Sequence, residues 1–357
     1  MKKILILAFA VFVLVNCTDK FNAPDNSVDP GYVVIGDTVY VQQNPIWEGF
    51  NKPKDILVGH EPFLYVADTD NDRVVMMDLS GRVLGSKSVK RPIALAQDFK
   101  LNLIVCAQFD TLINGNQVTY SAVYKMDLFS VDHQIENVKL KRLLPKSSFD
   151  FLRTDRVYTG VCVFSDNSFF VSRTGPSNNN IIDPDNGIFI FAQKRKSNGS
   201  VVDTLMGRVP LLEPEGTGLM SSNKISSLTS FNDSRRDIIV TLIGNNSFKS
   251  QWLRFVSTAD FTGYENNLAP FYSRLMEINR FGKPEDASLD DRNNIFVADA
   301  EKDSIFKFNS FGDEMESFGG PAIFNAPHAI AYFDKTLYVV DTNNNRILRF
   351  ILSTDID

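Results

Sequence analysis

The chain has 357 residues, of which 43% are hydrophobic and 22% are charged, a balance typical of a folded globular protein rather than a disordered or fibrous one. The formal net charge is -6, and no run of Lys and Arg is longer than the three residues 194–196. An acidic chain without a basic cluster argues against a nucleic-acid-binding surface.

The first 17 residues have the pattern of a bacterial secretory leader. Two lysines precede an apolar run over 4–15, which is shorter than the roughly 20 residues of a membrane-spanning helix. Residues 14–17, LVNC, resemble the lipobox, in which the cysteine is lipidated and becomes the new N-terminus. We predict a lipoprotein signal peptide at 1–17 with lipidation of Cys17. The alternative is an ordinary secretory signal that happens to contain a cysteine.

Residues 18–37 are polar, with scattered Asp, Asn, Pro and Gly, and this composition predicts a flexible tether. Removal of Lys2 and Lys3 with the leader changes the net charge from -6 to -8. Acyl chains contribute about 0.8 kcal/mol per buried methylene, so several of them would anchor the protein without a spanning helix. Thr18 stands where enteric bacteria place the Asp that retains lipoproteins in the inner membrane. The expected location is the bacterial cell envelope, at the outer membrane, facing the periplasm or the cell surface.

Three segments repeat one pattern, starting with Phe-x-x-Pro at Phe50, Phe281 and Phe324. An alternating strand follows, then an aliphatic-aromatic-Val strand that ends in Asp, a polar turn and a further strand. The pattern resembles the NHL repeat, and this resemblance implies a β-propeller. Weaker copies fill the middle of the chain, at 91–105, 159–171 and 225–240. The predicted fold is all-β, a single six-bladed propeller over 38–357; a seventh blade hidden in 197–224 is the alternative.

The two ends of the predicted propeller complement each other. The last repeat ends at 346–353, which supplies only its third strand, whereas an unassigned strand over 38–43 precedes the first repeat. An open array would leave exposed strand edges, and pairing the ends removes them. We therefore predict that the N-terminal strand completes the C-terminal blade.

The repeat also contains residues whose expected role is structural. A short acidic side chain after a strand can accept backbone N–H bonds from the following turn, and an arginine returns on the next strand. These residues are Asp68, Arg73, Asp299, Asp341 and Arg346.

A propeller usually meets its ligands on the face where inner strands start and second strands end. The residues expected there, at the channel mouth, are Lys54, Asp55, Glu285, Asp286 and His328. Longer Asn-rich and Gly-rich segments are expected on the same side, at 108–117, 173–186 and 244–250. Extended loops on a rigid scaffold commonly hold binding specificity; the alternative is that they are surface elaborations without a ligand.

Two patterns in the sequence bear on metal binding. The resemblance includes peptide-amidating lyases, which hold a metal with histidines at several blade entrances, but only His328 of the three histidines occupies such a position. A three-histidine site is therefore excluded. A zinc site of His328 with its acidic neighbours stays open, as does calcium at Asp183 and Asp185, whose D-x-D-x-G spacing suits that ion.

Cys106 and Cys162 lie within apolar strands of neighbouring blades, where we expect free thiols, with a disulfide as the alternative. No G-x-S-x-G, HExxH or glycine-rich phosphate loop is present. We predict a non-enzymatic binding or scaffolding lipoprotein whose partner is an envelope protein, a glycan or a small ligand, with contact to the membrane through the lipid only and none to nucleic acid. The alternative is a periplasmic or surface hydrolase or lyase that uses a metal near His328.

Overall fold

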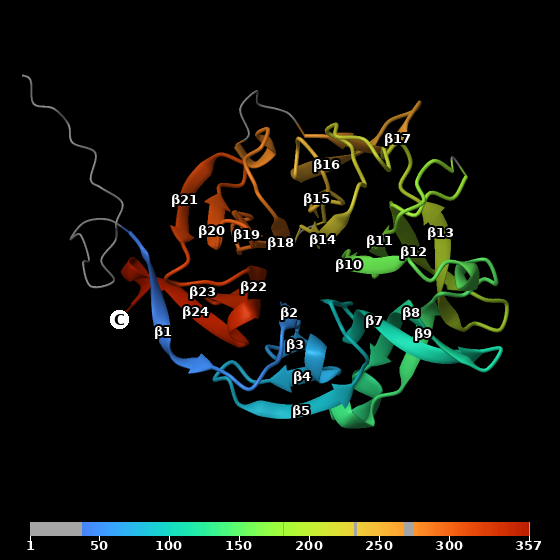
Figure 1. Ribbon diagram of the computed structural model, residues 1–357, viewed down its shortest axis with the longest axis horizontal. Coiled ribbons are helices and arrows are strands. Elements are labelled where there is room, and N and C mark those ends of the chain that lie inside the picture. The colour runs from blue at the N-terminus through green and yellow to red at the C-terminus, as the bar shows by residue number, and fades with distance from the viewer. Residues whose placement is uncertain (1–37, 181, 232–233, 268–273, 357) are drawn as a thin grey trace, which may run out of the picture. The chain divides into compact units, whose positions relative to one another are not determined.

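The computed structural model describes residues 38–356 except 181, 232–233 and 268–273. The predicted signal peptide, Cys17 and the tether lie outside the described residues. Residues 39–357 form one compact unit, in which six four-stranded antiparallel sheets are arranged in a ring (Figure 1). The predicted all-β, six-bladed propeller is confirmed.

The blades are numbered here in chain order from the first Phe-x-x-Pro segment. Blade 1 contains β2 (Pro53–Val58), β3 (Leu64–Asp68), β4 (Arg73–Met77) and β5 (Val83–Ser88), and blade 2 contains β6 (Ala94–Gln97), β7 (Asn102–Ile113), β8 (Asn116–Asp127) and β9 (Leu140–Leu144). Blade 3 contains β10 (Val157–Val163), β11 (Phe169–Thr174), β12 (Gly187–Arg195) and β13 (Val201–Arg208), and blade 4 contains β14 (Ile225–Ser230), β15 (Ile238–Leu242), β16 (Ser250–Ser257) and β17 (Thr262–Asn266). Blade 5 contains β18 (Pro284–Leu289), β19 (Ile295–Asp299), β20 (Ser304–Phe308) and β21 (Glu314–Gly319), and blade 6 contains β22 (Pro327–Phe333), β23 (Thr336–Asp341), β24 (Arg346–Leu352) and β1 (Tyr40–Trp47).

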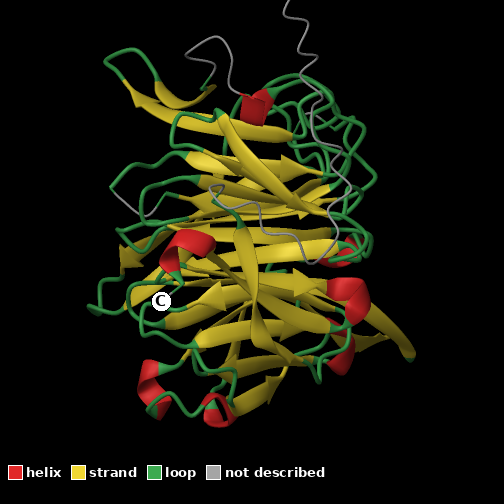
Figure 2. Ribbon diagram, turned by 90° about the vertical axis from the view of Figure 1, so that its left-hand side faces the viewer, coloured by secondary structure: helices red, strands yellow, loops and turns green. Residues whose placement is uncertain are grey.

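Helical structure is limited to single turns between strands (Figure 2). In the described part of the chain these 3₁₀ turns are η1 (Thr69–Asn71), η2 (Phe129–Val131), η3 (Ile135–Asn137), η4 (Asp150–Leu152), η5 (Arg274–Met276), η6 (Thr342–Asn344) and η7 (Ser353–Asp355). Within the same residues, no helix has the length and apolar character needed to cross a bilayer.

The core consists of apolar clusters between neighbouring blades. Strand β3, for example, is buried over all five of its residues, because a blade that packs on both faces needs apolar side chains on both sides of its strands. One cluster joins Ile56 and Val66 of blade 1 to Ala329 and Tyr338 of blade 6. Corresponding clusters lie at the other five blade interfaces.

The N-terminal strand completes the C-terminal blade, as predicted. β1 pairs antiparallel with β24, with Tyr40 opposite Leu352 and Gln43 opposite Arg349. The strand is longer than the predicted 38–43 and continues to Trp47 after a register irregularity. The pairing therefore joins the two ends of the described propeller through a complete four-stranded sheet.

The blade 6 closure has a testable anchor in Tyr40, whose ring stacks on Phe318 at a centroid distance of 4.8 Å and accepts a 2.9 Å hydrogen bond from Lys307 Nζ at its hydroxyl. We expect Tyr40→Ala to lower the free energy of unfolding by about 2 kcal/mol, because a half-buried aromatic contact with blade 5 is lost. Tyr40→Phe, which keeps the ring, is expected to cost about 1 kcal/mol or less. Urea unfolding measures both; equal losses would show that the ring contact contributes little.

The predicted insertion at 108–117 is strand rather than loop. β7 and β8 continue through it and are paired to Ile113 and Asn116. Asn114 and Gly115 form the turn with φ of 50° and 80°, which is the two-residue hairpin turn that Asn-Gly favours. The prediction of a loop was wrong because it weighed composition above this turn signal. The stretch 197–224 forms no seventh sheet within the described residues: it supplies β13 and then a connection with one isolated bridge, Glu213 to Ser221.

The acidic residue at the end of the second strand ties the incoming loop to the following turn. Asp68 is fully buried and accepts hydrogen bonds from Asn51 N at 2.7 Å and from Arg73 Nε at 2.7 Å. Asp299 accepts from the backbone N–H groups of Gly282 and Lys283 at 2.6 and 2.8 Å. Each carboxylate thus satisfies donors that a buried loop would otherwise leave unpaired.

Candidate functional site

Each blade contributes one residue from the start of its inner strand to the same end of the channel. In five blades the ladder between the first two strands skips a residue, which is a β-bulge that redirects a side chain. These residues are Lys54, Thr159, Ser226, Glu285 and His328. In blade 2, Ile93 stands at the corresponding position, directly after Pro92 and before β6. All six side chains line one cavity.

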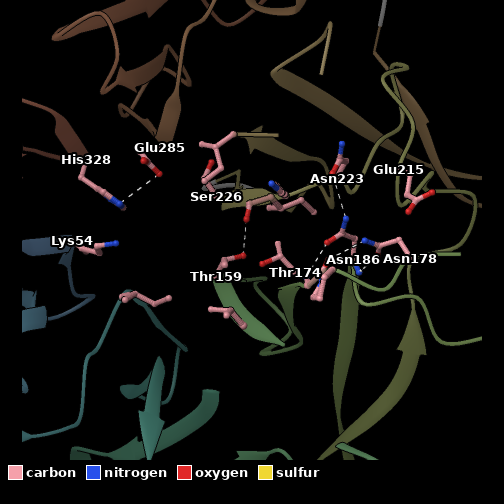
Figure 3. Close-up of a pocket in the computed structure, with 17 residues that line it drawn as sticks. Lys54, Thr159, Thr174, Asn178, Asn186, Glu215, Asn223, Ser226, Glu285 and His328 are labelled. Atoms are coloured by element: carbon pink, nitrogen blue, oxygen red, sulfur yellow. Dashed lines mark hydrogen bonds and ion pairs between the residues drawn. The ribbon is translucent and has the colours of Figure 1, made fainter. Parts of the chain in front are cut away.

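This cavity has a volume of about 710 Å³ and lies between the ring formed by these five bulge residues with Ile93 and the connections of blades 3 and 4 (Figure 3). The connections contribute amide and acidic side chains. These are Asn178, Asn186, Glu215 and Asn223. We call this space the mouth cavity; its outer wall comes mainly from the segment that the sequence marked as the 173–186 insertion.

The two sides of the mouth cavity differ in chemistry. Blades 1, 5 and 6 contribute the ionisable side chains Lys54, Glu285 and His328, which lie together on one side in Figure 3. Blades 2, 3 and 4 contribute mainly apolar and hydroxyl side chains, together with the exposed Lys224; the apolar and hydroxyl residues are Ile93, Val157, Thr159, Ile225, Ser226 and Ile243. The cavity therefore offers a ligand a charged wall and a mainly apolar one.

Glu285 is the best-partnered group of the charged wall. Its side chain is 5% exposed; Oε1 lies 2.5 Å from Lys283 Nζ and Oε2 lies 3.5 Å from His328 Nε2. Burial opposes its ionisation, but His328, Lys283 and Lys54 together bring the pKa of Glu285 below its usual range. Burial also lowers the pKa of His328 to about 4, so this imidazole is neutral at pH 7 and Lys283 supplies the counter-charge.

Lys54 has a different environment. Its half-buried ammonium group points into the mouth cavity in Figure 3, and burial lowers the pKa of Lys54, an effect that the charge of Glu285 partly opposes. Within the described residues, no hydrogen bond or ion pair at contact distance involves its Nζ atom.

Asp55 and Asp286 do not belong to the mouth. Each follows a bulge residue and its carboxylate accepts a backbone N–H from the next blade, Leu95 at 2.6 Å for Asp55 and Ile330 at 3.0 Å for Asp286. Both line a second cavity of about 580 Å³ on the other side of the bulges. Burial raises the pKa of Asp286 to about 6, and burial together with the charge of Asp286 raises that of Asp55. Of the five residues predicted at the mouth, the structure brings together Lys54, Glu285 and His328.

The carboxylates of Asp183 and Asp185 form ion pairs with two arginines. Arg156 lies 2.5 Å from Asp183 and 2.7 Å from Asp185, and Arg173 lies 2.8 Å from Asp183. A calcium ion here would have to compete with two guanidinium groups. The geometry therefore favours these carboxylates as anchors of the blade 3 loop over the predicted calcium ligands.

The zinc hypothesis also lacks a ligand set. His60 stacks on Phe99 and His133 faces Glu61, so neither joins His328. Across the described residues, no group of three or more His, Cys, Asp and Glu side chains is placed to hold a metal. Cys106 and Cys162 are buried free thiols.

Three of the six ring residues could not be identified as site residues from their chemistry. Ile93, Thr159 and Ser226 carry no charge, in contrast to Lys54, Glu285 and His328. The residue directly after Pro53, Pro92, Pro284 and Pro327 is the ring residue, and that rule would have found Ile93. Blades 3 and 4 have Tyr158 and Ile225 in place of the proline, so Thr159 and Ser226 could be located only through the strand pairing.

The comparisons with known proteins show a similarity of fold and nothing more specific. The sequence matches no protein-family model and no curated protein. Among solved structures, a putative gluconolactonase has 11% identity, with 86% of this chain and 90% of that chain covered and a TM-score of 0.53. A calcium-binding protein, regucalcin, from Agrobacterium tumefaciens has 10% identity, with 84% and 89% covered and a TM-score of 0.53. An auxiliary nutrient binding protein from Bacteroides thetaiotaomicron has 10% identity, with 86% and 68% covered and a TM-score of 0.53.

Proposed function

We propose that this propeller is a non-enzymatic binding module that takes a small ligand into its mouth cavity. The cavity carries the proposal: its volume of about 710 Å³ falls in the range of small-molecule sites, which are roughly 300–1,000 Å³ and combine apolar walls with a few polar groups. The mouth cavity has this composition, since its lining includes Ile93, Val157 and Ile243 as well as Lys54 and Glu285.

The loop that closes the cavity is held in place, which supports a preformed site. Arg156 and Arg173 pair with Asp183, and Asn186 accepts the N–H of Gly175 at 3.1 Å while its amide donates to Pro214 O at 2.7 Å. A wall fixed before binding lowers the ordering cost that a ligand must offset. The blade 3 loop is therefore better explained as the wall of a binding site than as a surface elaboration without a ligand.

The propeller fold is compatible with both binding and catalysis, because one fold can support many activities. The solved propellers of similar shape include both a putative gluconolactonase and a nutrient binding protein. The binding role is preferred here because the described lining residues include one ionisable pair, Glu285 with His328, and no third group of a metal-ligand set beside it. A metal-assisted hydrolase or lyase would require such a set.

The test is a thermal-shift panel on the full chain with monosaccharides, amino acids and aryl carboxylates at millimolar concentration. A ligand present at 100 times its Kd should raise the free energy of unfolding by about 2.7 kcal/mol. Ile243→Trp, which places an indole in the cavity, should abolish the shift. Leu112→Trp is the matched control because Leu112 is 73% exposed at the blade 2 hairpin. No stabilisation by any class, or a shift unchanged in Ile243→Trp, would contradict the proposal.

We also propose that Cys17 anchors the propeller to the envelope membrane by lipid, with residues 18–37 as the tether. The support is the sequence pattern at 1–17. In cells fed an alkyne-tagged fatty acid, the protein should become labelled and partition into detergent, and Cys17→Ser should lose both properties. Cys106→Ser should retain them, since Cys106 is buried in β7. Labelling that persists in Cys17→Ser would contradict the proposal.

A further inference from the structure

The unpaired ammonium group of Lys54 contrasts with the buried lysines elsewhere in the propeller. Lys125 lies 2.9 Å from Asp98 and 3.1 Å from Asp203, and Lys307 contacts Glu316 at 3.4 Å. Such pairing offsets the cost of removing a cation from water. Among the residues that the structure describes, Lys54 has no such contact, although its side chain is half-buried in a cavity wall.

The nearby carboxylate does not take the place of a partner. Glu285 already contacts Lys283 at 2.5 Å and His328 at 3.5 Å. Its field supports the charge of Lys54 at longer range, but the cation in contact with it is Lys283. Lys54 is therefore the half-buried cation of the cavity that remains available to a ligand, whereas Lys224, the other lysine of the lining, is exposed to solvent.

The rest of the cavity determines what kind of anion fits. Ile93, Val157 and Ile243 form the apolar wall, which suits a hydrocarbon or aromatic body. Glu215 lies on the side away from Lys54 in Figure 3, so it repels an acidic group placed there and directs that group toward Lys54. With Glu285 also close, a single negative charge is accommodated better than the double charge of a phosphate.

We infer that the mouth cavity binds an amphipathic monocarboxylate, whose acidic group pairs with Lys54 and whose apolar body lies along the wall formed by Ile93, Val157 and Ile243. This inference rests on the proposed binding function and specifies its ligand. A carboxylate at Lys54 would form the charge-assisted hydrogen bond that the ammonium group lacks within the described protein.

Three fluorescent probes with the same aromatic body test the inference on the full chain. They are 1-naphthaleneacetate, 1-naphthaleneacetamide and 2-(1-naphthyl)ethylamine, which are anionic, neutral and cationic at pH 7. We expect the carboxylate to bind about 10-fold more tightly than the amide, which corresponds to a single charge-assisted contact, and the amine to bind most weakly. Fluorescence titration gives the three dissociation constants.

Substitutions at Lys54 test whether its charge causes the preference for the carboxylate probe. Lys54→Met should remove the 10-fold preference for the carboxylate and leave the affinity for the amide unchanged, whereas Lys54→Arg should retain the preference. Lys87→Met is the matched control, since Lys87 lies on the outer strand β5 and contacts Glu136 O. Each variant is first checked for an unchanged melting temperature, so that a loss of folding is not read as a loss of binding.

Two outcomes overturn the inference and leave the binding function intact. Equal affinity for carboxylate and amide would show that the ligand need not be anionic, and tightest binding of the amine would assign recognition to Glu285 or Glu215. If none of the probes binds, the inference also fails. The binding function is then decided separately by the thermal-shift panel and Ile243→Trp.

Discussion

Asp341→Ala is expected to lower the free energy of unfolding by about 3 kcal/mol. Asp341 is fully buried at the end of β23. Its Oδ1 accepts Asn325 N at 2.7 Å, and its Oδ2 accepts Asn344 Nδ2 and Arg346 Nε, both at 2.8 Å. Removal of the carboxylate leaves these donors without an acceptor, and each unsatisfied buried group costs about 1–3 kcal/mol.

The expected loss is smaller than the summed cost of three unsatisfied donors, because the Arg346 side chain is 24% exposed. Its guanidinium group can therefore form hydrogen bonds with water. Urea-induced unfolding at pH 7 measures the loss, with the m-value checked for a two-state transition. Asp260→Ala is the matched control: this exposed aspartate in the blade 4 hairpin should change the free energy of unfolding by no more than about 0.5 kcal/mol. A loss below about 1 kcal/mol in Asp341→Ala would show that water replaces the carboxylate.

The motif around Asp341 is one that can be recognised from the sequence alone. A carboxylate that accepts hydrogen bonds from a turn within five residues produces a local motif, and Asp68 with Arg73 repeats the arrangement in blade 1. Blades 1, 5 and 6 could therefore be recognised from the sequence. In blade 3 the equivalent strand ends with Arg173 and Thr174, so its position rested on strand pattern alone.

The channel mouth could be predicted only in part, for a geometric reason. Successive residues of a strand face opposite sides, and a one-residue shift reverses them. The bulges at Lys54 and Glu285 produce such a shift, so these two side chains enter the mouth cavity, whereas Asp55 and Asp286 bond to the next blade. A single sequence does not show a bulge, because the bulge depends on the pairing with the neighbouring strand.

The calcium prediction at Asp183 and Asp185 differs from the structure because of contacts with residues that are distant in the sequence. The spacing of Asp183 and Asp185 suited calcium, but Arg156 comes from the connection before β10 and Arg173 from β11. Both arginines meet these carboxylates only after blade 3 has formed. No pattern within residues 183–187 indicates that its charges are already neutralised.

The stability of the propeller is expected to contain a component that decreases as the pH rises from about 4 to about 6; Asp286→Asn should remove the part due to Asp286, and Asp55, whose pKa is also raised, contributes with the same sign. Burial raises the pKa of Asp286 to about 6 in the folded chain, whereas an unfolded Asp titrates near 3.9. Between these values the folded state binds a proton that the unfolded state lacks, so stability falls as the pH increases through this window. The component is about 1–3 kcal/mol, since two pKa units correspond to about 2.7 kcal/mol and partial exposure reduces it.

The asparagine variant can keep the local hydrogen bonds. Asp286 Oδ1 accepts Ser227 Oγ at 2.6 Å and Oδ2 accepts Ile330 N at 3.0 Å. An asparagine can accept from Ile330 N with its oxygen and donate to Ser227 Oγ with its nitrogen, because a hydroxyl group serves in either role. The substitution therefore changes the charge and leaves the contact between blades 5 and 6 satisfied.

The informative quantity is the difference in the free energy of unfolding between Asp286→Asn and the parent chain, measured by urea at pH values from 4.5 to 7.5. Carboxylates with lowered pKa values, such as Glu285 and Asp183, contribute with the opposite sign, and the subtraction cancels them. The difference should grow in favour of the variant as the pH rises and level off above about 6.5. Asp291→Asn, an exposed neighbour in the same blade, should give a flat difference. A flat curve for Asp286→Asn as well would mean that this carboxyl group titrates normally, and that water in the channel solvates it despite its position between the blades.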